Sequence, residues 1–502
     1  MSSYVSIGTY GATLSIPHFK GLLQYGDGIN SDPTYASDAR NVDTRAGVLQ
    51  PAAACELLLP TLPHPIETLM RLHRRWYTGE DDKDLLVAAS AGKLYAMLPT
   101  ASAWTELSIP VEAFTNDKWS WVTYEINPEG SEASVDVLLL SNADDGMFMV
   151  RGDDLSVSKV PSPKNFGVIE RYAERIWGGA IKNDPDMLVY SAPYDPTNWT
   201  ANVEIPEDGA GDLNQPSWDG DSFTALRSFG SQLIAFKRTR VWRVLGTDPG
   251  EYTFKEQFGG GCAYEKTIAV DNERILMLSD KGVVAYDGLS VSPFLQQYAE
   301  DVWKQVRREG LENASATLWQ GRYYLAVPLG DSQVNNAVVI YDPVDDTWLL
   351  RDDVCVEDFL ATEDTLYFTS STTPGQIWRW REDSWETGLP TPAATRWVTP
   401  WSDLSVKNVL KGGFEVYLLP EVQRNPVTLT ISVQTEKKIK TKQYVVRPLS
   451  DSDQRKQKSA KQKKIHFGGT GRRFRLIIEA PPNSHPWRLI SGVTVMAELD
   501  PD

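Results

Sequence analysis

The fold of this chain is indicated by one stretch, from Ile275 to Gly288, which reads Ile-Leu-Met-Leu-Ser-Asp-Lys-Gly-Val-Val-Ala-Tyr-Asp-Gly. Two short apolar runs flank a Ser-Asp-Lys-Gly turn, and an Asp-Gly pair closes the second run. Asp and Gly favour the tight turn of a β-hairpin, and apolar residues rich in Val and Ile favour the strands beside it. The stretch therefore predicts a hairpin at the centre of one antiparallel sheet.

The same pattern occurs six more times, and the seven predicted hairpins recur at intervals of roughly 40 to 55 residues, as expected for propeller blades of four strands each. The other six pair Leu85–Ala89 with Leu94–Met97, Val135–Leu140 with Met147–Val150, Arg175–Ile181 with Met187–Ser191, Leu233–Phe236 with Val241–Val244, Tyr323–Val327 with Val338–Tyr341, and Leu366–Thr369 with Ile377–Trp380. Two β-sandwiches would show turns without this longer period. We therefore predict an all-β chain with a β-propeller of six or seven blades. The propeller is divergent, because the WD40, kelch and sialidase signatures are absent.

The segments on either side of the hairpins differ in character. Residues 1–60 are rich in turn residues and predict an extended N-terminal arm. Its apolar residues, such as Leu22, Leu23 and Val48, need burial on its own propeller, which we favour, or on a neighbouring subunit. Residues 61–385 hold the propeller hairpins. Residues 386–502 contain longer alternating strands, which predict a C-terminal antiparallel β-sandwich.

Three details accompany this division. Apolar residues recur at helical spacing between Ser292 and Glu309, which predicts the single sizeable helix of the chain. The acidic, glycine-rich stretch from Pro206 to Asp221 lacks the spacing of a calcium loop, so we predict a solvated loop. We expect most tryptophans near the strands to pack between blades, with a sugar-binding platform as the alternative. These are Trp104, Trp177, Trp199, Trp242, Trp319, Trp348, Trp378 and Trp385.

The charge of the chain is unevenly distributed. The 502 residues include 67 Asp or Glu and 50 Lys or Arg, for a formal net charge of −17. Such an excess of acid argues against a general nucleic-acid binder, whose affinity comes from neutralising phosphates. The segment from Glu436 to Lys464 is the exception, because Lys and Arg far outnumber its acids. We predict that residues 436–464 form a long exposed basic loop or hairpin tip.

The motifs that carry enzyme chemistry are absent from the sequence. There is no nucleophile elbow, phosphate-binding loop, dinucleotide fingerprint or zincin motif, and the five histidines suggest no catalytic triad. The three cysteines, Cys55, Cys262 and Cys355, have neither disulfide nor zinc spacing. We therefore predict no enzyme activity and no cofactor. A glycosidase would need carboxylates that converge from different blades.

Localisation signals are absent as well. The N-terminal residues lack a basic region followed by an apolar core, and no run of about 18 apolar residues occurs anywhere in the chain. We therefore expect no export signal and no membrane span.

Three groups of segments resemble the tail nozzle or hub proteins of short-tailed bacteriophages, also called packaged-DNA stabilisation proteins. The first group lies in the arm, the second in the central blade, and the third near the C-terminal end. They are Phe19-Lys-Gly-Leu, Asn30-Ser-Asp-Pro and Ala36-Ser-Asp-Ala-Arg-Asn-Val-Asp with Gly47-Val-Leu; Gly260-Gly-Cys-Ala-Tyr-Glu-Lys-Thr-Ile-Ala with Leu278-Ser-Asp-Lys-Gly-Val-Val-Ala-Tyr-Asp-Gly; and Thr395-Arg-Trp, Gly471-Arg-Arg-Phe-Arg, Trp487-Arg-Leu and Glu498-Leu-Asp-Pro-Asp. The match is scattered along most of the chain.

This resemblance implies a structural virion protein, assembled in the host bacterial cytoplasm, that forms a ring of about six copies in the phage tail. The ring would continue the DNA channel below the portal and adaptor proteins, contact other tail proteins or fibres, and retain and then release the genome. An acidic wall suits a conduit, because it repels phosphate and lets DNA pass without specific binding. The alternative function is a tail-tip propeller that binds host-surface carbohydrate, which an exposed aromatic cluster would favour.

The basic segment gives the most specific prediction. If it faced the channel it would bind DNA, so we expect it on the outside or at a subunit seam, paired with acidic surface of another copy or of the adaptor. A merely solvated hairpin tip is the other possibility. The candidate inter-subunit basic patch consists of Lys437, Lys438, Lys440, Lys442, Arg455, Lys456, Lys458, Lys461, Lys463 and Lys464.

Overall fold

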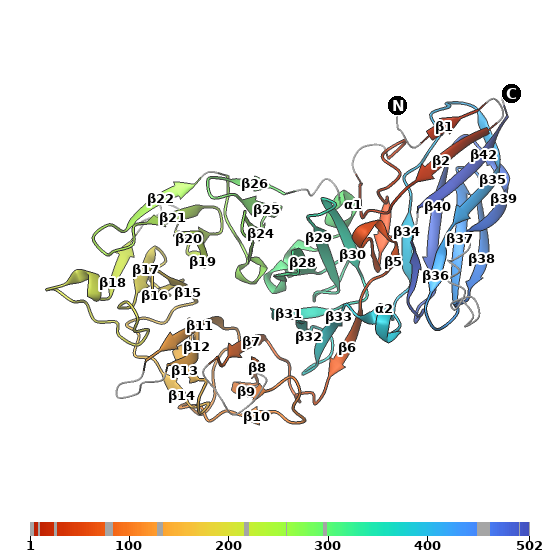
Figure 1. Cartoon of the computed structure of the whole chain (residues 1–502). Helices are drawn as coiled ribbons and strands as arrows, with labels where there is room; N and C mark the ends of the chain where they lie inside the picture. The colour runs from red at the N-terminus through yellow and green to blue at the C-terminus, as the bar shows by residue number, and fades with distance from the viewer. Residues whose placement is uncertain are drawn as a thin grey trace.

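A computed structural model of the chain describes residues 5–8, 11–24, 28–75, 84–127, 134–214, 220–257, 259–294, 299–448, 462–490 and 492–500. Seven four-stranded antiparallel units surround a common axis, and a β-sandwich adjoins them on one side (Figure 1). The predicted architecture, a divergent β-propeller followed by a C-terminal sandwich, is therefore confirmed. The propeller has seven blades.

Each of the first four blades is one continuous segment of the chain, with its first strand nearest the axis. Their strands are β7 (Thr68–His73), β8 (Asp84–Ser90), β9 (Lys93–Met97) and β10 (Thr105–Glu106); β11 (Ser120–Ile126), β12 (Val135–Asn142), β13 (Gly146–Arg151) and β14 (Val157–Lys159); β15 (Val168–Tyr172), β16 (Arg175–Gly179), β17 (Met187–Tyr190) and β18 (Gly211–Asn214); and β19 (Phe223–Phe229), β20 (Gln232–Lys237), β21 (Val241–Leu245) and β22 (Thr253–Gln257).

The fifth and sixth blades follow the same order, and the seventh takes only three strands from its own part of the chain. They contain β23 (Ala269–Val270), β24 (Ile275–Ser279), β25 (Gly282–Tyr286) and β26 (Val291–Pro293); β27 (Ser315–Trp319), β28 (Arg322–Val327), β29 (Ala337–Asp342) and β30 (Thr347–Arg351); and β31 (Val356–Ala361), β32 (Leu366–Ser370) and β33 (Ile377–Arg381). All seven predicted hairpins are present as antiparallel pairs.

The hairpin between Ile275 and Tyr286 has the expected turn. Ser279 pairs with Gly282, so Asp280 and Lys281 form a two-residue loop between β24 and β25. Gly282 has a φ of 113°, a backbone conformation that side-chain-bearing residues rarely adopt. The glycine therefore permits the turn, and the apolar runs bury both strands between neighbouring blades.

Aromatic side chains fill the wedges between blades, as predicted. In the contact of the third and fourth blades, the ring of Trp177 lies 4.8 Å from that of Tyr190 and 4.9 Å from that of Tyr252. Five of the eight tryptophans are buried, namely Trp177, Trp242, Trp319, Trp348 and Trp385, but Trp385 lies after the last blade strand and packs on Arg488 of the sandwich. Flat rings with a large apolar area suit these tapering gaps.

The seventh blade is completed by a strand from the N-terminal segment. Strand β6 (Ala54–Leu58) pairs antiparallel with β33, with Leu58 opposite Ile377 and Glu56 opposite Arg379. The predicted boundary at residue 60 therefore needs correction, because residues 54–58 belong to the propeller and not to an extended arm. The outer strand closes the ring by joining two segments that are distant in sequence.

The C-terminal domain consists of two antiparallel sheets that face each other across an apolar core. One sheet has the order β34-β40-β37-β38 and the other the order β1-β2-β42-β35-β39, with a small β36-β41 ribbon beside them. The strands are β1 (Val5–Ile7), β2 (Gly11–Ile16), β34 (Thr395–Val398), β35 (Leu410–Leu418), β36 (Pro420–Val422), β37 (Val427–Thr435), β38 (Ile439–Val446), β39 (Lys463–Gly471), β40 (Phe474–Ala480), β41 (Trp487–Leu489) and β42 (Val493–Asp500). The N-terminal strands β1 and β2 thus belong to the sandwich.

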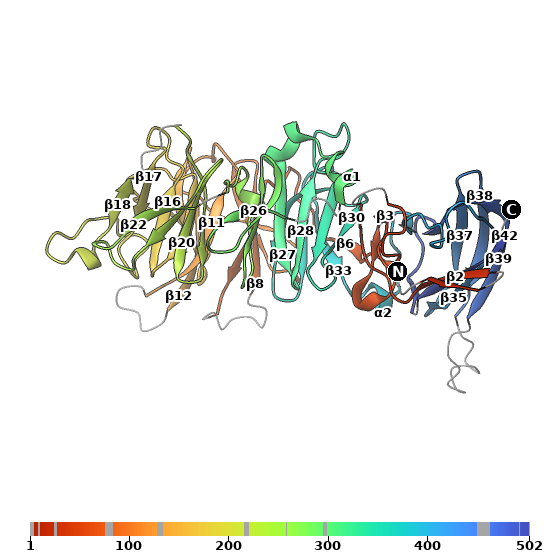
Figure 2. The same ribbon diagram turned by 90° about the horizontal axis from the view of Figure 1, so that it is seen from above.

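The arm between β2 and β6 passes between the two domains (Figure 2). Phe19 and Leu22 of the arm are buried within the same chain. The Phe19 ring contacts the Trp397 ring edge to face, with ring centres 5.0 Å apart. Strand β3 (Asp38–Arg40) pairs with β34 of the sandwich and makes one parallel pair with β30 of the sixth blade. Short pairs and turns follow in β4 (Val42–Asp43), η1 (Arg45–Gly47) and β5 (Gln50–Pro51). The arm therefore joins the propeller to the sandwich.

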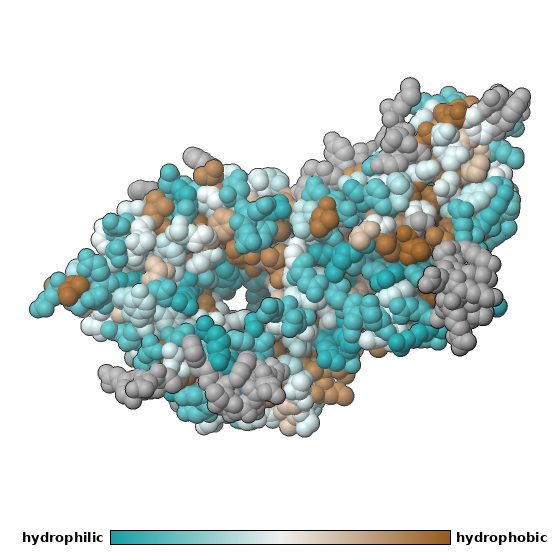
Figure 3. Space-filling view, viewed as in Figure 1, coloured by the Kyte–Doolittle hydropathy of each residue, from teal (hydrophilic) through white to brown (hydrophobic). Residues whose placement is uncertain are grey.

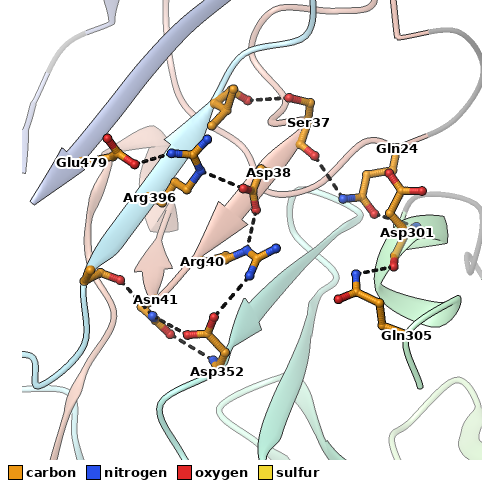
Figure 4. A network of polar contacts seen from close by, with 12 residues as sticks. Gln24, Ser37, Asp38, Arg40, Asn41, Asp301, Gln305, Asp352, Arg396 and Glu479 are labelled. Carbon is orange, nitrogen blue, oxygen red and sulfur yellow. Dashed lines mark hydrogen bonds and ion pairs between the residues drawn. The ribbon is translucent and has the colours of Figure 1, made fainter. Parts of the chain in front are cut away.

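Polar contacts fix this arm on both sides (Figure 4). The Asp38 carboxylate accepts hydrogen bonds from Nε of Arg40 and Nε of Arg396, each at 2.9 Å. Asn41 and Asp352 exchange hydrogen bonds at 2.7 and 3.1 Å. Because Asp352 follows the sixth blade and Arg396 lies in the sandwich, the arm is tied to each domain by charged groups.

The predicted helix from Ser292 to Glu309 is wrong in the described residues. Ser292 lies in strand β26, and α1 (Glu300–Trp303) is the only α-helical turn among the described residues of this stretch. The apolar residues make separate contacts instead of one helical face: Phe294 packs on Tyr341 at 4.8 Å. The other helices described after the arm are also short, with three to six residues: η2 (Pro206–Asp208), η3 (Glu265–Thr267), η5 (Arg308–Asn313) and α2 (Ser384–Thr387). None of the described helices is long and apolar enough to cross a membrane.

Candidate functional site

The predicted basic loop is largely strand where the structure describes it. Residues 439–446 form β38 and Lys463 begins β39, so the prediction of a long loop is wrong for these residues. The alternative, a hairpin tip, fits Lys437 and Lys438, which lie in the turn of the β37–β38 hairpin. The sequence of β38 has no alternation of apolar and polar residues to indicate a strand, because all of its residues except Val446 are exposed or half-buried. Strands β38 and β39 are each the last strand of their sheet, and these two strands contact each other. Six predicted residues thereby come together as a basic edge: Lys437, Lys438, Lys440, Lys442, Lys463 and Lys464. Arg455, Lys456, Lys458 and Lys461 lie outside the described residues.

Part of this basic edge covers the sandwich core. Lys442 lies opposite the buried Ile431 of β37, and its Nζ is 5.8 Å from the centre of the Phe467 ring in the other sheet. Conversely, Nζ of Lys463 in β39 lies 5.6 Å from the centre of the Tyr444 ring in β38. Long basic side chains can cover apolar surface with their stems while the charge stays in water. Inward-pointing charges also protect sheet edges from pairing with other chains.

Lys464 has a partner in its own chain. Its Nζ is 2.8 Å from Oε1 of Glu415 on the neighbouring strand β35, and Nδ1 of His466 is 3.0 Å from the same oxygen. The hydrogen bond with Glu415 raises the pKa of Lys464, and it lowers the pKa of Glu415. This lysine is therefore already paired within the single chain.

The remaining three lysines of the edge are exposed. Lys437 and Lys438 lie in the turn between β37 and β38, and Lys440 follows in β38. Within the described residues, no carboxylate forms an ion pair with any of them. The edge also exposes Ile439 and Val445, at 54% and 46%. These features suit a contact with another molecule.

A second polar site lies on the propeller axis, where the first strands of all seven blades meet. It is a cavity of about 250 Å³, and the surface is hollowed at this place in Figure 3. Five charged residues line it, and we call them the axial cluster: Glu170, Arg227, Glu265, Lys266 and Asp358.

Ion pairs of the axial cluster join different blades. Nη1 of Arg227 lies 3.9 Å from Glu170 and 3.7 Å from Glu265, and Nζ of Lys266 lies 3.4 Å from Asp358. Burial raises the pKa of Glu170 and of Glu265, although Arg227 opposes the shift. Positive and negative groups from the third, fourth, fifth and seventh blades thus constrict the axis.

Carboxylates from different blades do converge here, which is the arrangement that a glycosidase would require. Each is held by contacts within the fold. Glu265 accepts a hydrogen bond from Ser120 Oγ at 2.9 Å, and Glu170 accepts one from the backbone N–H of Ser228 at 3.2 Å. Asp358 accepts from the backbone N–H of Leu69. The arrangement serves to join blades, and no group of three metal-ligating side chains occurs among the described residues.

Sequence reasoning missed the axial cluster, because it looked for hairpins and not for the strands that precede them. The available signal was a charged residue in or just before the first strand of a blade, as at Glu170 and Asp358. Such strands face a polar channel on one side, where charge is tolerated.

Another cavity, of about 450 Å³, lies where the arm meets the outer face of the sandwich. Its charged lining residues are already paired, since Arg40 contacts Asp352 at 3.5 Å and Arg396 contacts Glu479. The platform that a carbohydrate site would need is also not seen, because Tyr194 is the single aromatic among the exposed large apolar side chains of the described chain.

Comparisons with known proteins find distant likeness among solved structures alone. No family model matches the chain. No curated protein matches it either. Among solved structures it is similar to the WD40 domain of Pan2 from Neurospora crassa, with 11% identity, over 66% of this chain and 95% of that one, and a TM-score of 0.36.

Proposed function

We propose that this chain is a structural virion protein that forms a ring in a bacteriophage tail. As a nozzle or hub, the ring continues the DNA channel below the portal and adaptor, retains the packaged genome and then releases it. The protein acts without a cofactor and without catalysis. It assembles in the host cytoplasm and remains in the virion.

One observation carries the proposal. Lys437, Lys438 and Lys440 are exposed on a sheet edge with no carboxylate partner among the described residues. The strand order puts this edge on the side of the sandwich away from the propeller. On a chain of net charge −17, this is the surface that fits an acidic neighbour.

Two further features are consistent with a ring subunit. Ion-paired side chains from several blades line the propeller axis, so we expect a duplex to pass between copies and not through one. The arm is bonded to propeller and sandwich alike, which makes the chain a stiff building unit. Because the described chain has no long apolar helix, we expect the isolated protein to be a monomer or a weak oligomer that assembles on a portal and adaptor platform.

Charge reversal at the edge tests the proposal. The variant Lys437→Glu, Lys438→Glu, Lys440→Glu should fold normally, yet fail to enter tails in particles purified from infected cells. The control reverses three exposed lysines elsewhere, Lys255, Lys281 and Lys407, and should enter tails as the parent does. Normal incorporation of the edge variant would refute the role of the edge. Absence of the parent chain from tails would refute the virion function itself, and particles that assemble but lose DNA would put the edge in the channel.

A further inference from the structure

The third blade carries a long loop between β17 and β18, residues 191–210, which we call the blade-three loop. The equivalent connections are much shorter, for example 246–252 in the fourth blade and 287–290 in the fifth. Long loops with little secondary structure are uncommon in compact domains and are usually functional. In Figures 1 and 2 this part of the propeller, beside β18, projects at the end opposite to the sandwich.

The surface of this loop is both apolar and acidic. Every residue from Ala201 to Asp208 is exposed. Val203 is 92% exposed and Ile205 50% exposed, although both would gain from burial. The segment from Tyr194 to Asn214 contains only acidic charged residues: Asp195, Glu204, Glu207, Asp208 and Asp212.

The blade-three loop is nevertheless held firmly. Arg175 is buried, and its guanidinium donates to the carbonyl oxygens of Ser191 at 2.8 Å and Gly209 at 2.5 Å, and to that of Glu207. Asn202 Oδ1 accepts from the backbone N–H groups of Glu204 and Ile205 at 3.1 and 3.0 Å.

Burial of an arginine is costly unless its donors are satisfied, and here the backbone of the loop satisfies them. A solvated connection needs no such anchor. A surface whose shape is fixed in advance, in contrast, binds a partner with less loss of conformational entropy.

We infer that the blade-three loop is a docking surface for a protein that presents an apolar recess bordered by Lys and Arg. Val203 and Ile205 would enter the recess, and Glu204, Glu207 and Asp208 would meet the basic border. DNA and anionic lipid do not fit, because the loop would repel phosphate. The location of this partner rests on the proposed function: in a tail it is the protein of the adjacent layer along the tail axis.

A second copy of this chain fits less well. The loop and the basic edge lie at opposite ends of the molecule (Figures 1 and 2), so a contact between them would link copies end to end. Such head-to-tail contacts produce rings or filaments whose width follows the length of the subunit. A narrow channel needs subunits side by side, with their ends free for other proteins.

Photo-crosslinking in assembled particles tests this inference. A benzophenone amino acid at Val203 should crosslink to a Lys- and Arg-rich segment of one other protein. Val344 provides the control site, because it is 89% exposed and is followed by Asp345 and Asp346, but it lies in a four-residue turn. Adding Glu204→Lys and Glu207→Lys should reduce the Val203 crosslink at least fivefold, and Arg175→Lys should reduce it by loosening the loop.

Three results would overturn the inference: equal crosslinking from Val203 and Val344, crosslinks to another copy of this chain, or crosslinks to DNA or lipid. A blot of purified particles is read first, because absence of the chain there contradicts the proposed function separately. In that case the same crosslinking is carried out in the cells that produce the chain, and the same criteria apply.

Discussion

Lys266 Nζ lies 3.4 Å from Asp358 Oδ1, so the fifth and seventh blades are joined across the propeller axis. Asp358 also accepts a hydrogen bond from the backbone N–H of Leu69 in the first blade at 3.0 Å and one from Ser315 Oγ in the sixth at 3.2 Å. One carboxylate thus connects four blades where the ring closes. The axial cluster acts as a brace, and its residues are the first targets for tests of stability.

Asp358→Asn should lower the free energy of unfolding by about 1 to 3 kcal/mol, because a buried acceptor is altered and Lys266 loses its counter-charge. Denaturant unfolding measures the change. The control is Asp364→Asn in an exposed turn, which should stay within about 0.5 kcal/mol of the parent. Equal midpoints for both variants would show that the axial contact contributes no stability.

Glu265→Gln should change how stability depends on pH. Burial raises the pKa of Glu265, so the folded chain holds this proton more tightly than the unfolded chain. The resulting loss of stability begins as pH rises above the unfolded value of about 4.3 and is complete above the folded pKa. Glutamine resembles the neutral acid. The stability of the variant relative to the parent should therefore increase as the pH rises from about 4.5 to about 7.5, as measured by denaturant unfolding. A constant difference across this range would contradict the prediction; Glu363→Gln, at an exposed position, gives the baseline.

Reversing the charge of two lysines of the basic edge should have different effects on stability. Lys442→Glu should cost about 1 kcal/mol, because it puts a carboxylate near the face of Phe467 and removes the stem that covers the core. Lys437→Glu, in the exposed turn, should change stability by less than about 0.5 kcal/mol. Thermal unfolding of the two variants compares them directly. The reverse order would mean that Lys442 does not cover the sandwich seam.

The strand that closes the propeller can be weakened at Glu56. Its carboxylate is 2.7 Å from Nη2 of Arg379 and also contacts Arg381. Burial opposes the shift, but hydrogen bonds from these arginines lower the pKa of Glu56, so this contribution is present at neutral pH and is lost as pH falls through the lowered pKa. Glu56→Gln should cost about 0.5 to 1 kcal/mol, because the groups are partly exposed. Hydrogen exchange over residues 54–58 should accelerate, while residues 233–236 in the fourth blade should not change. Unchanged exchange at 54–58 would contradict the prediction.

The sequence allowed the hairpins to be predicted because each depends on local pattern. The turn after Ser279 and the apolar runs beside it lie within a few residues of each other, and the same holds in every blade. Pairings between distant segments left no such signal. Nothing near Ala54–Leu58 indicates a partner at Ile377–Arg381. Strand β2 likewise pairs with β42, which lies at the other end of the chain, and no local turn joins the two.

The candidate sites divide in the same way. Lysine-rich composition was visible, so the basic edge was found, but its residues were assigned to a loop or hairpin tip because β38 is exposed along nearly its whole length and shows no alternation. The axial cluster was missed, since charged residues become neighbours only when seven separate blades meet. The helix expected near Val302 failed because its apolar residues are buried by different parts of the fold and not by one face.

Closure by β6 has a consequence for how the chain is made. Ala54–Leu58 leaves the ribosome long before Ile377–Arg381, so this strand must wait, unpaired, while seven blades are synthesised. The sandwich has the same property, because β2 waits for β42. A chain that stops before β33 leaves both domains with open strand edges, and one that stops between β33 and β42 leaves the sandwich open; such edges favour aggregation and are recognised by quality-control systems. The topology acts as a length check: only a chain translated through β42 can offer two finished domains to its neighbours.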